Sequence, residues 1–230
     1  MEEQAYYLTY KQTIYTLDMN DYSFTLHCER VRRFTMKKNR PKYKAIIDGA
    51  VQVIAENGYH ASQVSKIAKK AGVADGTIYL YFKNKEDILV SVFREKMGQF
   101  IQKIAEATNK EQNVKEKLLT LIKLHFEQLA VDHHLAIVTQ LELRQSDPKI
   151  RLQINNVLKD YLDIIDMILE EGMKQDVIRR DLNIPLMRQM IFGTIDETVT
   201  SWVMKNQKFD LVSLAPEVHD LLMNGLSSNK

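Results

Sequence analysis

From Pro41 onward, apolar residues recur at the three- and four-residue spacing of one helix face. The first such segment carries them at Tyr43, Ile46, Ile47, Ala50, Val51 and Ile54. This spacing is typical of an amphipathic α-helix. No run typical of a buried strand, and no hairpin signal between alternating runs, interrupts the pattern farther along the chain. The sequence therefore predicts an all-α fold.

Capping residues and helix breakers indicate where the helices begin and end. Pro41 suits a first helical turn, Gly58 a C-terminal cap, and Asp147-Pro148 an N-cap followed by an N1 proline. Ser62 and Asn84 are expected to be N-caps of the second and fourth helices. Further helices are predicted at about 62–71, 75–82, 85–104, 113–131, 133–145, 148–174, 184–205 and 210–227.

Charge divides the chain into three parts. Residues 36–85 hold ten basic and three acidic residues, a net charge of +7. Residues 86–230 carry a net charge of −4 and residues 1–35 one of −1. A short basic module at 36–85, joined to a larger acidic one at 86–230, suggests a polyanion partner for the first module only. On charge alone, a solvated basic face is an alternative.

Residues 1–35 differ from the rest. They show no helical stripe and contain five of the ten tyrosines and the only cysteine, Cys28. We expect a flexible, dispensable extension upstream of a plausible start at Met36. One thiol cannot form an internal disulfide, no secretory leader is recognisable, and no apolar segment approaches the roughly 20 residues that span a bilayer. These features predict a cytoplasmic location and no membrane partner.

Residues 62–85 have the pattern of a helix–turn–helix: a short helix, a glycine turn and a second short helix. At about 100° per residue, Ile78 and Phe82 point inward together. The opposite face then carries Gly76, Thr77 and Leu80, with tyrosines at 79 and 81 on its flanks. Small residues facing the bases and longer ones reaching the phosphates suit a helix in the major groove. A surface helix with two exposed tyrosines is the alternative.

Lys85 lies in the first turn of the next helix, where a cation opposes the helix dipole by about 0.3–1 kcal/mol. A bound anion would reverse that penalty, and a DNA phosphate is the simplest candidate. Alternatively, Lys85 is merely solvated, and Glu86 and Asp87 offset the dipole.

Residues 50–89 resemble the DNA-binding module of TetR-type transcriptional regulators. The match lies at Gly58-Tyr59, Ile67-Ala68, Gly72-Val73, Gly76-Thr77, Tyr79, Tyr81-Phe82, Lys85-Glu86 and Leu89. The resemblance implies a homodimer of about nine helices per subunit that binds palindromic operator DNA, with an effector site in the C-terminal domain. The residues expected to bind DNA are Ser62, Ala74, Asp75, Gly76, Thr77, Tyr79, Leu80, Tyr81 and Lys85.

The sequence departs from the family at two places. Ala74 stands where relatives often have a capping serine, a loss of about 1 kcal/mol that Asp75 can offset through the helix dipole. Gln175-Asp176 stands where relatives often have glycine, which leaves the conformation of that turn open.

The C-terminal segments Leu135–Ser146 and Arg188–Met204 are similar to a branch of this family that regulates fatty acid metabolism in Bacillus. That similarity implies a repressor of fatty-acid degradation genes that long-chain acyl-CoA releases from its operator, with no other cofactor. A multidrug-type or other small-molecule-responsive repressor is the alternative.

Candidates for effector binding are the cations Lys123, Arg144 and Arg151, for the CoA phosphates, and His125. Structural ion pairs are an alternative role for each cation, and a hydrogen-bonded core position for His125. No catalytic constellation, G-x-G-x-x-G or P-loop is present, and adjacent His133 and His134 would point about 100° apart on a helix. We therefore predict neither an enzyme nor a metal site. A purely architectural DNA binder would not need the large acidic domain.

Overall fold

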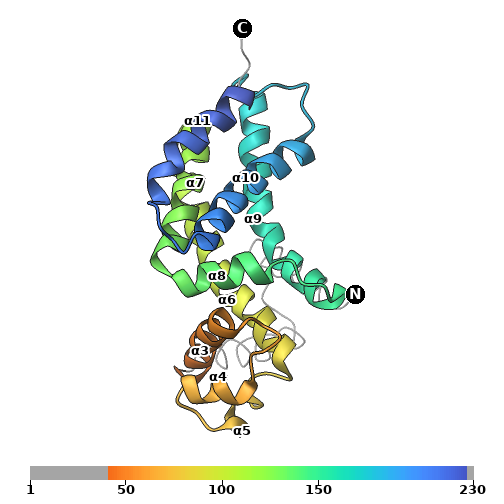
Figure 1. Ribbon diagram of the computed structural model, residues 1–230. Coiled ribbons are helices and arrows are strands. Elements are labelled where there is room, and N and C mark those ends of the chain that lie inside the picture. Colours follow the sequence, from red (N-terminus) through yellow and green to blue (C-terminus); the bar gives the residue numbers. More distant parts are fainter. Residues whose placement is uncertain (1–40, 227–230) are drawn as a thin grey trace, which may run out of the picture. The chain divides into compact units, whose positions relative to one another are not determined.

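The computed structural model describes residues 41–226, and the regular elements in that range are helices (Figure 1). The predicted extension 1–35, Met36 and the basic residues before Pro41 lie outside the described part. The α-helices are α3 (Pro41–Asn57), α4 (Val64–Lys70), α5 (Asp75–Ile78), α6 (Lys85–Thr108), α7 (Val114–Val131), α8 (His133–Glu142), α9 (Pro148–Lys174), α10 (Ile184–Met204) and α11 (Ala215–Leu226), with a 3-10 turn, η1 (Val212–Leu214), before α11.

Side-chain caps set the N-terminal ends of the longer helices. Asn84 Oδ1 accepts a hydrogen bond from Asp87 N (2.8 Å), as predicted, and so fixes the start of α6. Asp147 Oδ1 accepts from Lys149 N (2.7 Å) ahead of Pro148, which confirms the predicted start of α9. The N-caps of α7, α8 and α10 are Asn113, Asp132 and Asn183, whose side chains also accept hydrogen bonds from backbone N–H groups.

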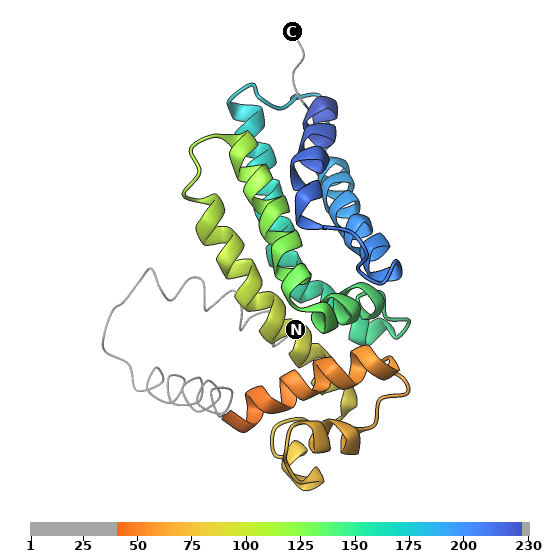
Figure 2. The same cartoon turned by 60° about the vertical axis from the view of Figure 1, so that its left-hand side comes forward.

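The residues from Lys44 onward form one compact unit. Within it, α6 runs from the short helices α4 and α5 into the larger bundle, where it packs on α7 and α9 (Figures 1 and 2). Helix α10 packs on α8 and α9, and α11 packs on α7. The rings of Phe100, His125 and Tyr161 contact one another in the interior between α6, α7 and α9. None of the described helices has the length and apolar character needed to cross a bilayer.

Several predicted helix ends were wrong. Helix α4 begins after Gln63, and Ser62 does not cap it: its hydroxyl donates to Gly58 O (2.7 Å) and Val53 O (3.2 Å). Helix α5 ends at Ile78, whereas the prediction extended it to 82, because three-residue turns replace the helical hydrogen bonds of its last part. The helix predicted at 133–145 ends at Glu142. The helix predicted at 210–227 begins only at Ala215, after the 3-10 turn.

The turn after α9 takes the shape that glycine usually provides. Asp176 has φ 57°, a left-handed conformation, and the amide of Val177 donates to Gly172 O (2.9 Å). This is the geometry of a helix C-terminal cap, here adopted by an aspartate, which tolerates it better than most residues. The question that the sequence left open at Gln175-Asp176 is thereby answered.

Gly72, in the turn between α4 and α5, has φ +66°. We expect Gly72→Ala to destabilise the fold by about 1–2 kcal/mol, because a Cβ disfavours the left-handed conformation. Gly98→Ala is the matched control: Gly98 lies within α6 with nothing near its Cβ position, so that change should stabilise by about 0.5–1 kcal/mol. Urea unfolding measures both, and equal effects of the two substitutions would contradict the assignment.

Candidate nucleic-acid interface and internal cavity

Helix α5 presents the face that the sequence predicted. Ile78 and Phe82 are buried, and Tyr79 and Leu80 are 60% and 65% exposed. Asp75, Gly76 and Ala74 are also exposed, while Thr77 and Tyr81 are partly so. In the part of the chain that the structure describes, no atom lies within 4 Å of the Cβ position of Gly76, so that side of α5 is not covered by the described residues. The exposed set can therefore approach the edges of bases.

Ser62 and Lys85 instead hold the turn between α3 and α4. The hydroxyl of Ser62 is committed to the two backbone carbonyls named above, and the residue is 3% exposed. Lys85 Nζ donates to the carbonyl oxygens of Tyr59 (3.1 Å), His60 (2.9 Å) and Ser62 (3.3 Å). The ammonium group also lies 4.7 Å from the centroid of the Tyr59 ring. The partial negative charges of these carbonyl oxygens stabilise the ammonium group, and a phosphate contact of Lys85 stays a prediction.

Tyr59 belongs to the same turn and is nearly buried. Its burial, together with the nearby carboxylates of Glu86, Asp147 and Glu142, raises its pKa to about 12. The phenol is therefore neutral at physiological pH, and its ring packs as an apolar group beneath Lys85.

Other cations surround the exposed face. Lys69 and Lys83 are exposed, Lys66 Nζ donates to Asn57 Oδ1 (3.2 Å), and Lys70 lies 3.8 Å from Glu56. Such surface pairs are weak, about 0–1 kcal/mol, so these lysines can turn to phosphates at little cost.

A narrow cavity of about 30 Å³ lies inside the larger bundle. Helices α6 to α10 each contribute to its wall. The apolar lining comes from Met97, Phe100, Leu129, Leu135, Leu158 and Phe192, and the polar lining from Lys96, His125, Gln128, Thr139, Gln140 and Asp196. Its volume is that of one or two water molecules.

His125 gives this cavity a polar wall. Its Nδ1 lies 3.0 Å from the hydroxyl of Tyr161, and its Nε2 has no hydrogen-bond partner within residues 41–226. Burial lowers the pKa of His125 to about 4, so the imidazole is neutral at physiological pH. Burial, with Asp196 nearby, also raises the pKa of Tyr161. The imidazole of His125 thus has one nitrogen paired with Tyr161 and a second nitrogen without a partner among the described residues.

Asp196 is the second polar group at the cavity, and its side chain is 3% exposed. Burial raises its pKa, and the Arg144 guanidinium, 2.6 Å away, acts in the opposite direction. The amide of Gln140, turned with its nitrogen toward α10, lies 2.9 Å from Asp196 Oδ1. An ion pair and an amide therefore compensate the carboxylate for the loss of water.

Of the four effector-binding candidates, only His125 lines the cavity. Arg144 is paired with Asp196, and Arg151 donates to the carbonyl oxygens of Gln145 (3.2 Å) and Ser146 (3.4 Å). Lys123 lies on the surface of α7, 3.8 Å from Glu127. Sequence reasoning missed Lys96, a cation that lines the cavity and binds Asp48 Oδ1 of α3 at 2.6 Å. Lys96 lies seven residues after the buried Leu89 and four before the buried Phe100, and this helical spacing on the apolar face of α6 was the available signal.

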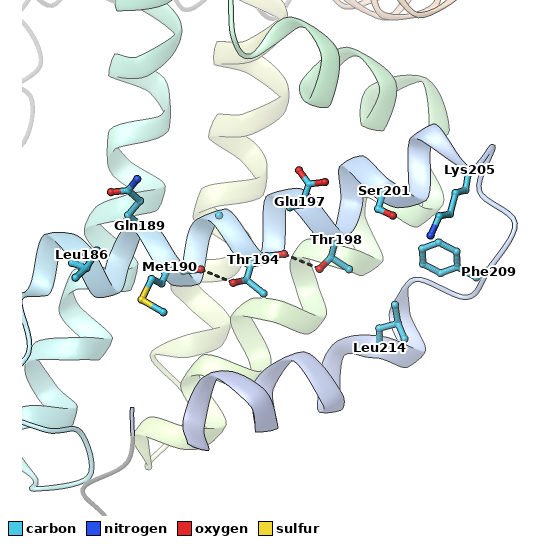
Figure 3. A pocket seen from close by; sticks show the side chains of 11 residues that line it. Leu186, Gln189, Met190, Thr194, Glu197, Thr198, Ser201, Lys205, Phe209 and Leu214 are labelled. Atoms are coloured by element: carbon cyan, nitrogen blue, oxygen red, sulfur yellow. Dashed lines mark hydrogen bonds between the residues drawn. The ribbon is translucent and has the colours of Figure 1, made fainter. Parts of the chain in front are cut away.

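A second hollow, a shallow groove of about 840 Å³, runs along the outer side of α10 (Figure 3). Leu186 and Met190 are more than half exposed there. Gly193 and Ser201 also line the groove, and their small side chains leave its floor unfilled. The hydroxyls of Thr194 and Thr198 donate to carbonyls of their own helix, both at 2.7 Å. The hydrogen-bonding needs of these two threonines are thereby met within α10, whereas Gln189, Glu197 and Lys205 add polar and charged groups to the groove.

Two family descriptions match the chain in succession. The description "Bacterial regulatory proteins, tetR family" matches residues 46–92. The description "YsiA-like protein, C-terminal region", which covers a TetR-type C-terminal region, matches residues 93–225.

Individual relatives cover most of the chain. The chain is 63% identical over 191 residues to the fatty acid metabolism regulator protein of Bacillus subtilis, an alignment that spans 83% of this chain and 98% of the relative. The crystal structure of B. subtilis FadR in complex with stearoyl-CoA is similar, with a TM-score of 0.78 over 80% of this chain and 99% of that one. The fatty acid degradation regulator FadR of Bacillus halodurans is 60% identical, with a TM-score of 0.77 and the same coverage of both chains.

Proposed function

The chain belongs to the TetR family of bacterial regulators, and on that premise we propose that it represses genes of fatty-acid degradation and releases its operator when long-chain acyl-CoA binds. It is a regulator and not an enzyme, as its relatives are. The observation that carries the proposal is the 63% identity to the B. subtilis regulator over almost that protein's whole length. The division into domains at 36–85 and 86–230 remains part of the proposal.

We assign base contacts to the exposed residues of α5 and phosphate contacts to the basic residues around it. Thr77 and Gly76 face outward at the centre of the exposed surface, with Asp75, Leu80 and the tyrosines at 79 and 81 around them. Ala74 precedes the helix and lies close enough to take part. Ser62 and Lys85 act indirectly in this assignment, because they hold the turn from which α4 and α5 follow.

The effector site that we propose is the internal cavity. A volume of about 30 Å³ cannot hold a long acyl tail, so binding must separate the helices that line it. Flexible side chains such as Met97 and Leu158 suit a lining that rearranges. His125 Nε2 supplies a polar contact for the acyl group, and Lys96 a cation for the anionic CoA portion. Arg144, Arg151 and Lys123 serve the local structure instead.

Release follows from differential binding. A tail that fits only the separated arrangement of α6 to α10 shifts the protein toward that arrangement. Helix α6 begins three residues after Phe82 of the α5 region, and Lys96 ties it to α3 through Asp48. Movement of α6 therefore changes the position of the DNA-facing helices.

We predict that acyl-CoA dissolves the operator complex in a chain-length-dependent way. Each buried methylene contributes about 0.8 kcal/mol, so affinity should rise on the order of tenfold per two carbons until the site is full. A gel-shift titration with CoA, free fatty acid and acyl-CoAs of increasing length measures this. Met97→Trp, which fills the cavity, should shorten the longest tail accepted, and Met167→Trp, on an exposed part of α9, should not.

Two outcomes would contradict the effector assignment. If long-chain acyl-CoA leaves the complex intact while an aromatic or cationic drug dissolves it, the protein is a multidrug-type regulator of the same fold. If Met97→Trp and Met167→Trp behave alike, the tail lies elsewhere.

We further propose that two copies meet through the groove of α10 and the neighbouring α11. Palindromic DNA requires a two-fold pair of reading helices, and a self-complementary face is the simplest way to build one. The exposed Leu186, Met190 and Leu221 supply the apolar area, and the small Gly193 allows close approach.

Gly193→Trp tests this interface. Nothing lies within 4 Å of its Cβ position, so the indole projects into the groove without disturbing its own subunit. We expect a folded monomer that binds operator at least tenfold more weakly. Gly98→Trp, an equally open helical glycine on α6, should remain dimeric. Sedimentation measures the mass, and a dimeric Gly193→Trp protein would rule the groove out.

A further inference from the structure

Glu142, the last residue of α8, joins the effector-binding bundle to the DNA-binding helices. Its Oε1 accepts a hydrogen bond from the backbone N–H of Tyr59 at 2.8 Å, across 83 positions of sequence. Its Oε2 accepts from Gln145 Nε2 at 2.6 Å, and Gln145 is 5% exposed. One carboxylate therefore binds the turn before α4 and the loop between α8 and α9 at once.

The turn that Glu142 binds is held from several sides. Lys85 of α6 binds three of its carbonyl oxygens, and Ser62 connects it to Val53 of α3. Helix α4 begins two residues after Ser62, and α5 follows it. A displacement of this turn therefore displaces the helix whose exposed face we assign to DNA.

The loop on the other side of Glu142 is anchored at the cavity. Arg144, two residues farther on, binds the buried carboxylate of Asp196, which lines the cavity. Arg151 of α9 binds the carbonyl oxygens of Gln145 and Ser146, so the loop is held to the start of α9 as well. Residues 142–146 thus contact the cavity wall at one point and the DNA-binding turn at another.

We propose that Glu142 is a positioning residue that transmits effector binding to the DNA-facing helices. The inference rests on the proposed function: a tail that separates α8 from α10 pulls on Arg144, moves residues 142–146, and shifts the Tyr59 turn through the Glu142 hydrogen bond. Glu142 does not line the cavity, so it acts on the coupling between the two sites and not on effector affinity.

The test compares Glu142→Ala, Glu142→Gln and the wild-type protein as full-length dimers. For each, operator affinity is measured with and without saturating stearoyl-CoA, and stearoyl-CoA affinity is measured separately. Glu142→Ala should bind stearoyl-CoA within threefold of wild type, and the factor by which stearoyl-CoA weakens operator binding should fall at least tenfold. Glu142→Gln, which keeps a neutral acceptor, should lose less of that factor. Glu106→Ala, an exposed glutamate of α6, should keep all of it.

Unchanged coupling in folded Glu142→Ala would overturn the inference. So would loss of operator binding by Glu142→Ala in the absence of stearoyl-CoA, because Glu142 would then merely build the DNA-binding unit. If Glu142→Ala does not fold, Glu142→Leu, which removes the acceptor and keeps the side-chain volume, takes its place: coupling equal to that of wild type in folded Glu142→Leu contradicts transmission through the hydrogen bond. Failure of the wild-type protein to release operator would instead refute the proposed function, and the wild-type measurement separates that case.

Discussion

Helix α6 contacts both the turn before α4 and the internal cavity, and the positions of these two regions depend on its continuous backbone. Its first turn holds the Tyr59–Ser62 turn through Lys85, and its middle lines the internal cavity with Lys96, Met97 and Phe100. A helix of 24 residues is about 36 Å long and transmits displacement because its hydrogen-bonded backbone resists bending. We therefore expect a widening of the cavity at α6 to displace the turn that Lys85 holds.

Two of the polar groups that line the cavity are buried, and burial is unfavourable for each of them unless it is paired. Asp196 and the neutral His125 would each favour a wet environment, and burying such groups costs about 1–3 kcal/mol where a partner is missing. Arg144 and Gln140 compensate Asp196, but His125 Nε2 has no partner. A ligand that supplies a polar partner at His125 and apolar contact elsewhere can therefore stabilise the separated arrangement of α6 to α10 that we propose.

The sequence predicted the elements better than the contacts between them. Caps such as Asn84 and Asp147 act locally, so their roles could be derived from neighbouring residues. The exposed face of α5 followed from helical periodicity for the same reason. The contacts of Lys85 and Ser62 could not be derived, because their partners are backbone carbonyls that only the folded turn brings together. The Arg144–Asp196 pair joins residues 52 positions apart, a pairing that no local pattern reveals.

Reciprocity between the two ligands tests the central claim most directly. If stearoyl-CoA weakens operator binding a hundredfold, a coupling of about 2.7 kcal/mol, then operator DNA must weaken stearoyl-CoA binding by the same factor. Calorimetric titration of stearoyl-CoA into the protein, alone and saturated with operator duplex, measures that factor. The account predicts equal factors in both directions. Equal stearoyl-CoA affinity with and without operator would show that the cavity and the DNA-facing helices are not coupled.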